Sequence, residues 1–258
     1  MTAGLPVAPA APAPPRLARR AWVEQIMGMP VSVHVRAVDP SRPDLEAGVR
    51  RVFGHLRRVD AVLSTWRSDS DLLRLQHGES EEAHAWVADV TELCLEAEDR
   101  TDGLFRAWRS RPGGRVAFDP TGLVKGWAVA GAAAHLDIVP EVAYAIGAGG
   151  DVVVGAGAGV SAAPPSWRVG IEDPRRAGAV ARVVTVRRGA VATSGAAARG
   201  GHVVDPRTGV GITRAGSATV VGPDLLWADV WATAAWVDPE RARRLMARRN
   251  AGYELLLG

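Results

Sequence analysis

The chain has 258 residues, of which 47% are hydrophobic and 23% charged, a balance typical of a globular protein with a sizeable core. Its net charge is only +3 and like charges form no long run, which argues against a nucleic-acid partner. The sequence holds no run of ~18 apolar residues, so we expect no membrane-spanning segment. The single cysteine, Cys94, excludes an internal disulfide. The first 20 residues are rich in Ala and Pro and lack the apolar core of a signal peptide, so we expect a disordered tail (1–20) before one folded domain (21–258) of a cytoplasmic protein.

The front of the folded region predicts one strand and then helices. Residues 21–37 alternate between polar and apolar positions, as a strand does. The next segment, 41–63, repeats its apolar residues at helical spacing, with Ser41 as the expected cap and Pro43 in the first turn. Two further helices are predicted over 80–99 and 121–135.

The second half changes to short β-type runs separated by Gly and Pro. The predicted strands are 143–146, 151–154, 167–171, 180–186, 190–193 and 217–221. A helix over 224–237, a second helix that begins at Asp238 and Pro239, and a closing strand over 253–257 follow. Helices in front and hairpin-like strands behind favour an α+β fold.

Asp229 and Thr233 lie four residues apart in an apolar helical segment, so their oxygens project from one helix face. A carboxylate and a hydroxyl are hard ligands that suit Mg²⁺ better than Zn²⁺. The alternative is a surface carboxylate beside a threonine that bonds to its own helix. The residues alone leave both interpretations open.

Residues 119–127 predict a carboxylate (Asp119), a turn, and the first turn of a helix that carries Lys125. Helix N-termini attract phosphate, and an ammonium group there adds positive charge. Lys125 is the only lysine in a chain that otherwise uses arginine, which suits a place where only a compact cation fits. The alternative is an Asp-capped helix with a surface lysine.

Two glycine clusters and one histidine complete the set of candidate features. The clusters at 147–151 and 155–159 do not spell a dinucleotide-binding fingerprint, so their glycines indicate tight turns or close approach of the backbone to a ligand. His202 lies among turn residues after the segment 192–195 and is the best candidate for a catalytic base.

Taken together, these segments resemble the ApbE family, the FAD:protein FMN transferases. The matching motifs occur in the family's order over nearly the whole chain after the tail: 27–30, 63–72, 119–127, 149–151, 167–174, 192–195, 202–209, 217–221 and 228–233. The resemblance implies mixed or antiparallel sheets with packed helices.

The resemblance also implies roles for individual residues. Asp229 and Thr233 would bind Mg²⁺ through side chains, and Gly122 and Ala232 through backbone carbonyls. Trp66 would stack on the isoalloxazine ring, and His202 would take the proton from the acceptor hydroxyl. The other residues expected to contact FAD are Met27, Leu104, Phe105, Arg106, Asp119, Lys125, Gly149, Gly150, Asp151, Thr193, Ser194 and Val203.

The implied reaction is a Mg²⁺-dependent cleavage of FAD, with transfer of FMN to a Ser or Thr of an acceptor protein and release of AMP. The sequence departs from the family pattern at Arg106, Thr121 and Gly147, where the family has Asp, Gly and Asn. Two other functions therefore stay open: an FAD pyrophosphatase that yields FMN and AMP, and a relative that binds flavin without chemistry.

Overall fold

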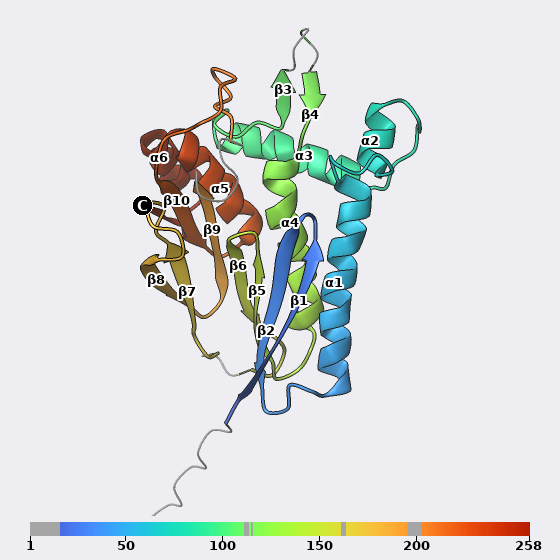
Figure 1. The fold of residues 1–258 in the computed structure, drawn as a ribbon, viewed down its shortest axis with the longest axis vertical. Helices are drawn as coiled ribbons and strands as arrows, with labels where there is room; N and C mark the ends of the chain where they lie inside the picture. Colours follow the sequence, from blue (N-terminus) through green and yellow to red (C-terminus); the bar gives the residue numbers. More distant parts are fainter. Residues whose placement is uncertain (1–15, 111–113, 115, 161–163, 196–202) are drawn as a thin grey trace, which may run out of the picture.

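An antiparallel seven-stranded sheet forms the centre of the computed structural model, which describes residues 16–110, 114, 116–160, 164–195 and 203–258 (Figure 1). The order of its strands is β1-β2-β5-β6-β9-β10-β11. Their bounds are β1 Ala18–Ile26, β2 Met29–Ala37, β5 Ala143–Ala148, β6 Asp151–Ala156, β9 Gly189–Gly195, β10 Ser217–Gly222 and β11 Glu254–Leu257.

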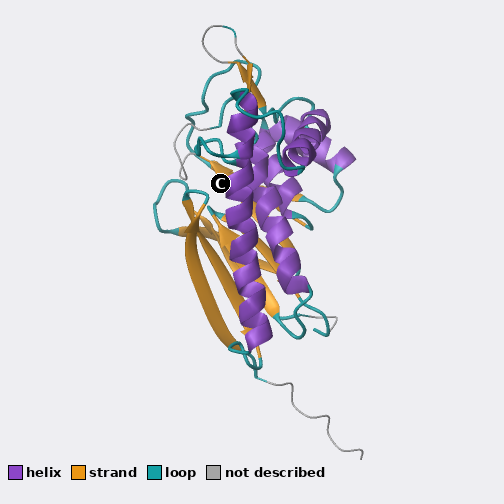
Figure 2. Cartoon of the chain, turned by 90° about the vertical axis from the view of Figure 1, so that its right-hand side faces the viewer, coloured by secondary structure: helices purple, strands orange, loops and turns teal. Residues whose placement is uncertain are grey.

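Three helices cover one face of this sheet, as Figure 2 shows. They are α1 (Pro43–Leu63), α4 (Thr121–Asp137) and α5 (Leu225–Val237). Side chains alternate across a strand, and β2 accordingly buries Val31, Val33 and Val35 against the helices while Pro30 and His34 are exposed. The main hydrophobic core therefore lies between the sheet and these helices.

A β-hairpin packs on the opposite face of the sheet. It consists of β7 (Trp167–Glu172) and β8 (Val180–Val186). Val186 of this hairpin joins Ala145, Val154 and Val191 of the central sheet in a second, smaller apolar cluster. Ala145 lies between two residues of the main core, so its side chain must point to the other face.

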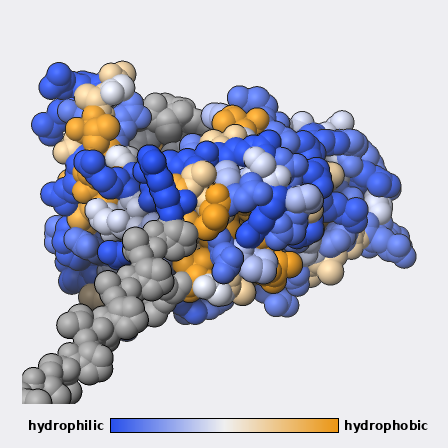
Figure 3. Space-filling model, turned by 90° about the horizontal axis from the view of Figure 1, so that it is seen from below, coloured by the Kyte–Doolittle hydropathy of each residue, from blue (hydrophilic) through white to orange (hydrophobic). Residues whose placement is uncertain are grey.

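The remaining elements lie at the upper end of Figure 1. They are α2 (Asp71–Gln76), α3 (Trp86–Arg100), β3 (Trp108–Ser110), β4 (Val116–Phe118) and α6 (Pro239–Arg249). The lower end, seen in Figure 3, is mostly hydrophilic, with hydrophobic residues in separate small areas. Among the described residues, no helix combines the length and apolar character needed to cross a bilayer.

The α+β architecture expected from the sequence is confirmed, with antiparallel sheets and packed helices. The last helix begins at Asp238 and Pro239 as expected, and the Asp238 carboxylate accepts a hydrogen bond from the Arg241 N–H. The Asp224 carboxylate caps the helix before it in the same way, by accepting from the Trp227 N–H. The strand at the C-terminus also forms, over Glu254–Leu257.

The single strand predicted over 21–37 is wrong, because the chain forms the hairpin β1–β2 there. Met27 and Gly28 make the turn with φ of 56° and 70°. Two successive positive φ values match the twist of a two-residue hairpin loop. Gly28 is a residue type that favours such a turn, whereas Met27 is not. Residues 18–20, assigned to the tail, are the start of β1, and residues 1–15 lie outside the described part.

Three local expectations for the helical region also need correction. Ser41 does not cap α1, because Arg42 is the N-cap residue and no side chain bonds the free N–H groups there. The helix predicted from residue 80 begins at Trp86. The short elements α2, β3 and β4 were not predicted, since three to six residues are too few for a periodic signal.

Candidate active site

Lys125 lies between two buried carboxylates at the upper end of α4. Its Nζ is 2.6 Å from Asp151 Oδ2 and 3.5 Å from Asp229 Oδ1. Asp151 is the first residue of β6, and Asp229 lies in the middle of α5. The carboxylate side chains are 0% and 3% exposed, whereas that of Lys125 is 22% exposed. Lys125 is therefore the member of the three that reaches the surface.

Glycines allow these elements to approach one another. The turn between β5 and β6 is Gly149-Gly150, with φ of 55° and 96°, a region that glycine occupies without strain. A Cβ at Gly149 would lie 2.7 Å from Met29 Sδ. A Cβ at Gly126 would lie 3.0 Å from the Asp229 Cβ. The backbone of α4 therefore packs directly on α5 beside the carboxylate.

The two buried carboxylates face only one ammonium group, and the pKa values of both are raised. Burial, together with repulsion from Asp151, raises the pKa of Asp229 to about 7. Burial also raises the pKa of Asp151, although Lys125 and the Thr193 N–H oppose the shift. Burial alone would lower the pKa of Lys125, but the attraction of both carboxylates outweighs it and the pKa is raised. The centre therefore carries an excess of negative charge whenever both carboxylates are ionised.

The Oδ2 atom of Asp229 is buried and has no hydrogen-bond partner among the described residues. A buried polar atom without a partner is costly, so this oxygen is suited to a further ligand. Thr233, one turn further along α5, places its Oγ1 3.2 Å from Ser194 Oγ of β9. Oxygen donors thus converge from α5 and β9.

Strand β9 also supports the carboxylate of Asp151. The Thr193 N–H donates a hydrogen bond of 3.1 Å to Asp151 Oδ1. The Thr193 Oγ1 lies 2.9 Å from Thr219 Oγ1 of β10. The side chain of Asp151 is therefore held from both sides, by Thr193 and by Lys125.

Asp119 and Gly122 lie at the start of α4, and Trp66 lies in the segment that follows α1. Asp119 accepts hydrogen bonds from the N–H (3.2 Å) and the hydroxyl (2.5 Å) of Thr121, and lies 3.4 Å from Arg109 Nε. Gly122 packs closely on Phe105, since a Cβ there would lie 3.1 Å from the ring. Trp66 as a whole residue is 89% exposed, so its ring is open to a planar ligand.

The segment that departs from the family pattern points mainly away from solvent. Leu104 and Phe105 are buried in the main core, and the Phe105 N–H donates to the hydroxyl of Thr101. Arg106, where the resemblance expects a carboxylate, is bound instead to Glu98, with Nη2 2.8 Å from its Oε1. The three residues thus anchor the region between α3 and β3.

The structure places the remaining predicted residues as follows. Met27 is in the β1–β2 turn and packs against the core, Val203 and Ala232 are buried, and Gly150 is exposed. The predicted base, His202, lies outside the described residues. In the part of the chain that is described, no group of three or more His, Cys, Asp or Glu side chains could form a metal centre. A metal here would therefore take its ligands from Asp229, hydroxyls and carbonyls, a donor set typical of Mg²⁺.

Sequence reasoning missed Gly126 and Met29, which shape this centre. A glycine inside a helix costs about 1 kcal/mol relative to alanine, so the Lys125-Gly126 pair was a usable sign of close helix packing. The sequence placed Met29 only within a predicted strand, because nothing local shows that its sulfur faces the Gly149 turn.

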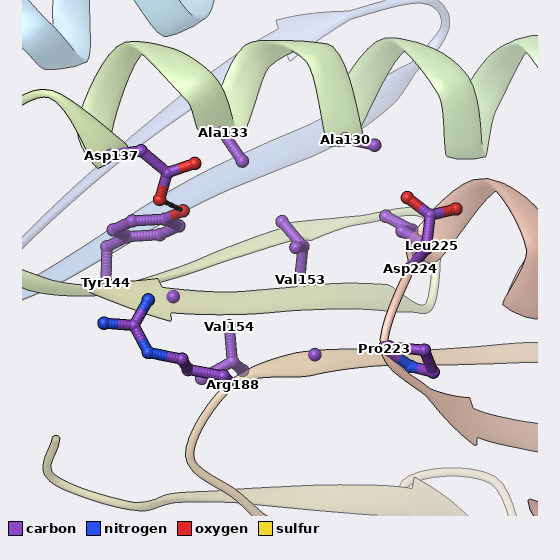
Figure 4. Close-up of a pocket in the computed structure, with 12 residues that line it drawn as sticks. Ala130, Ala133, Asp137, Tyr144, Val153, Val154, Arg188, Pro223, Asp224 and Leu225 are labelled. Atoms are coloured by element: carbon purple, nitrogen blue, oxygen red, sulfur yellow. Dashed lines mark hydrogen bonds between the residues drawn. The ribbon is translucent and has the colours of Figure 1, made fainter. Parts of the chain in front are cut away.

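The pocket in Figure 4 is separate from this centre. It has a volume of about 220 Å³ and lies beside the C-terminal half of α4, where the hydroxyl of Tyr144 is 2.5 Å from Asp137 Oδ1. Arg188 and Asp224 line it as well. No residue predicted for flavin or metal binding contributes to it.

Comparison of the whole sequence with known proteins shows the family of this chain. The sequence model of the ApbE family matches residues 27–108 and 106–257. The chain belongs to the ApbE family. A curated relative, the FAD:protein FMN transferase of Klebsiella pneumoniae (strain 342), is 25% identical over 298 residues, which cover 90% of this chain and 82% of the relative.

Solved ApbE structures share the fold. The ApbE protein of Thermotoga maritima superimposes with a TM-score of 0.74 at 19% identity, covering 93% of this chain and 94% of that one. The flavinyl transferase ApbE of Pseudomonas stutzeri, in its apo form, gives 0.73 at 21% identity and covers 94% of each chain. The flavin transferase ApbE of Vibrio cholerae gives 0.69 at 20% identity, covering 94% and 97%. This ApbE family member therefore shares the fold of those proteins over more than nine-tenths of their length.

Proposed function

We propose that this chain is a Mg²⁺-dependent FAD:protein FMN transferase that modifies a Ser or Thr of an acceptor protein. The observation that carries the proposal is the centre formed by Lys125, Asp151 and Asp229, in which two buried carboxylates share one ammonium group. Family membership and the likeness to flavin transferases agree with it. The excess of negative charge suits a divalent cation, and a cation bound there would in turn attract the pyrophosphate of FAD.

The residues present fit a magnesium ion. Asp229 has an oxygen without a hydrogen-bond partner among the described residues, and Thr233 adds a hydroxyl one turn away. The carbonyls of Gly122 and Ala232 are the further ligands we propose. When bound, the ion would neutralise charge on the pyrophosphate and on the departing AMP.

Lys125 is the group that we assign to the phosphates of FAD. It reaches the surface, whereas both carboxylates beside it are buried. It lies on the second turn of α4, whose first-turn N–H groups are partly used within the chain: that of Thr121 bonds to Asp119 and that of Leu123 to the Pro120 carbonyl. We propose that Asp151 acts only through Lys125, because its side chain has no accessible surface with which to touch FAD.

In the proposed reaction the acceptor hydroxyl oxygen attacks the phosphorus on the FMN side of the pyrophosphate. A P–O bond forms to the acceptor, the bond from that phosphorus to the bridging oxygen breaks, and AMP leaves with the bridging oxygen. A hydroxyl is a poor nucleophile without a base beside it, and the resemblance assigns that role to His202. The exposed ring of Trp66 would stack on the isoalloxazine.

The experiment that tests the proposal follows both products. Purified protein is incubated with FAD and Mg²⁺, with a candidate acceptor present or absent. AMP together with covalent FMN on the acceptor supports the transferase. AMP with only free FMN would identify a pyrophosphatase, and bound but uncleaved FAD would identify a flavin-binding relative without chemistry.

A further inference from the structure

A groove runs along the outer side of α1, away from the candidate active site. Its volume is about 550 Å³. Helix α1 supplies Arg50, Arg51, Gly54, His55 and Arg58 to it. The groove is therefore formed largely by one helix face, and none of these residues was needed to account for flavin transfer.

Aromatic rings form the inner wall of this groove. Trp86, at the start of α3, and His135, near the end of α4, line it with His55. The His55 ring lies 5.4 Å from that of Trp86 and 5.5 Å from that of His135, measured between centroids. Burial lowers the pKa of both histidines, so the wall is uncharged at neutral pH.

The rim of the groove, in contrast, is positively charged. Arg50, Arg51 and Arg58 are exposed, and none of them has an ion-pair or hydrogen-bond partner within the described residues. Their neighbour Arg57 is different, because it pairs with Glu24 of β1. Three guanidinium groups thus remain available for carboxylates from outside.

Gly54 supplies an independent sign that something else lies in this groove. A glycine within a helix is destabilising, and elsewhere in α1 packing explains it: a Cβ at Gly48 would lie 2.9 Å from Val139 Cγ2. A Cβ at Gly54 would meet nothing within 4 Å. Packing within this chain therefore does not require a glycine at position 54. The absence of a side chain there instead leaves the groove deeper for a bound partner.

We propose that this groove binds an acidic segment of the acceptor protein, with its carboxylates on the three arginines and an apolar side chain over Gly54 against the rings. The identity of the occupant as acceptor rests on the proposed function. His135 is ten residues from Lys125 along α4, which corresponds to about 15 Å at the rise of an α-helix. A segment docked here is thus close enough to present a separate hydroxyl to the active site.

The test uses a short fluorescein-labelled peptide of glutamates around one leucine, measured by fluorescence anisotropy. The variant R50E/R51E/R58E should bind it on the order of 10-fold more weakly, or worse, because like charges then oppose it. The matched control is R243E/R244E/R248E, which makes the same change of charge at three exposed arginines of α6. Binding by this control should stay close to that of the unmodified protein.

Gly54→Gln provides a second test that keeps the charge. The longer side chain should fill the floor and weaken peptide binding several-fold, while the midpoint of urea unfolding stays the same or rises. Added salt should weaken binding to the unmodified protein, since the contacts on the rim are exposed.

Several results would overturn the proposal. Equal losses in the two triple variants would show non-specific attraction. Binding of phosphatidylserine vesicles or of ATP through the three arginines, in place of the peptide, would identify another class of partner. AMP release from FAD should be unchanged in R50E/R51E/R58E. The AMP assay therefore tests the proposed function, and the peptide-binding assay tests the groove, independently of each other.

Discussion

Asp229 is a carboxylate enclosed by apolar residues of α5, and its burial explains both its raised pKa and its suitability as a ligand. The native pKa of about 7 lies above the value in the unfolded chain. The folded state therefore holds this proton more tightly, and the group reduces stability progressively as the pH rises from about 4 through 7.

Asp229→Asn should accordingly abolish activity without unfolding the protein. The amide has the same shape but no charge to offer a metal, so AMP release should fall on the order of 100-fold or more. The midpoint of urea unfolding at pH 8 should be unchanged or higher, because a buried charge has been removed. Full activity in this variant would reject Asp229 as a metal ligand.

Lys125→Arg tests whether the single lysine of the chain occupies a place that only an ammonium fits. A Cβ built at Gly149 comes 3.7 Å from Lys125 Cδ, so the site is narrow as well as charged. The wider, planar guanidinium cannot lie between the two carboxylates in the same way. We expect kcat for AMP release to fall about 10-fold or more, while circular dichroism stays native. Unaltered kcat would mean that any cation suffices there.

Cys94 offers a test of packing at α3. Burial raises the pKa of its thiol to about 12, so almost no thiolate is present at pH 8. Iodoacetamide should leave the native protein unmodified at that pH and alkylate one site after unfolding in urea, as read by mass spectrometry. Rapid labelling of the folded protein would contradict the position of α3 in the core.

At the scale of the element, two glycines of α1 should respond to the same substitution in opposite ways. Gly48→Ala introduces a Cβ 2.9 Å from Val139 Cγ2, at the contact between α1 and the end of α4, and should destabilise by about 1–3 kcal/mol. Gly54→Ala meets no neighbour and should stabilise by about 1 kcal/mol through helix propensity. Urea unfolding of the pair gives both values, and a common sign would show that the packing of α1 on α4 is misplaced.

Helices and strands whose apolar residues recur with a clear period could be predicted from the sequence. The turns between them could be predicted less well. The helix from Pro43 to Leu63 follows from its apolar spacing, and the start of the last helix from Asp238 and Pro239. The β1–β2 hairpin could not be predicted, because Met27 carries no sign of its positive φ. The tertiary structure alone imposes that conformation.

At the scale of the whole molecule, the site joins α4, β6, α5 and β9, which are far apart in the chain. The sequence identified Lys125, Asp151 and Asp229 as candidates through separate motifs. It could not show that one ammonium bridges the two carboxylates, since that contact depends on how the helices pack on the sheet. The fold also contributes what no motif contains, namely the burial that alters all three pKa values.

The most direct test of the proposed function is AMP release from FAD by the purified protein, with Mg²⁺ and with EDTA in its place. We predict AMP formation with Mg²⁺, loss of that activity with EDTA, and recovery when Mg²⁺ is restored. AMP formation that is unaffected by EDTA would contradict the metal site at Asp229. FAD binding without any AMP would contradict the assignment of phosphoryl chemistry to the centre around Lys125.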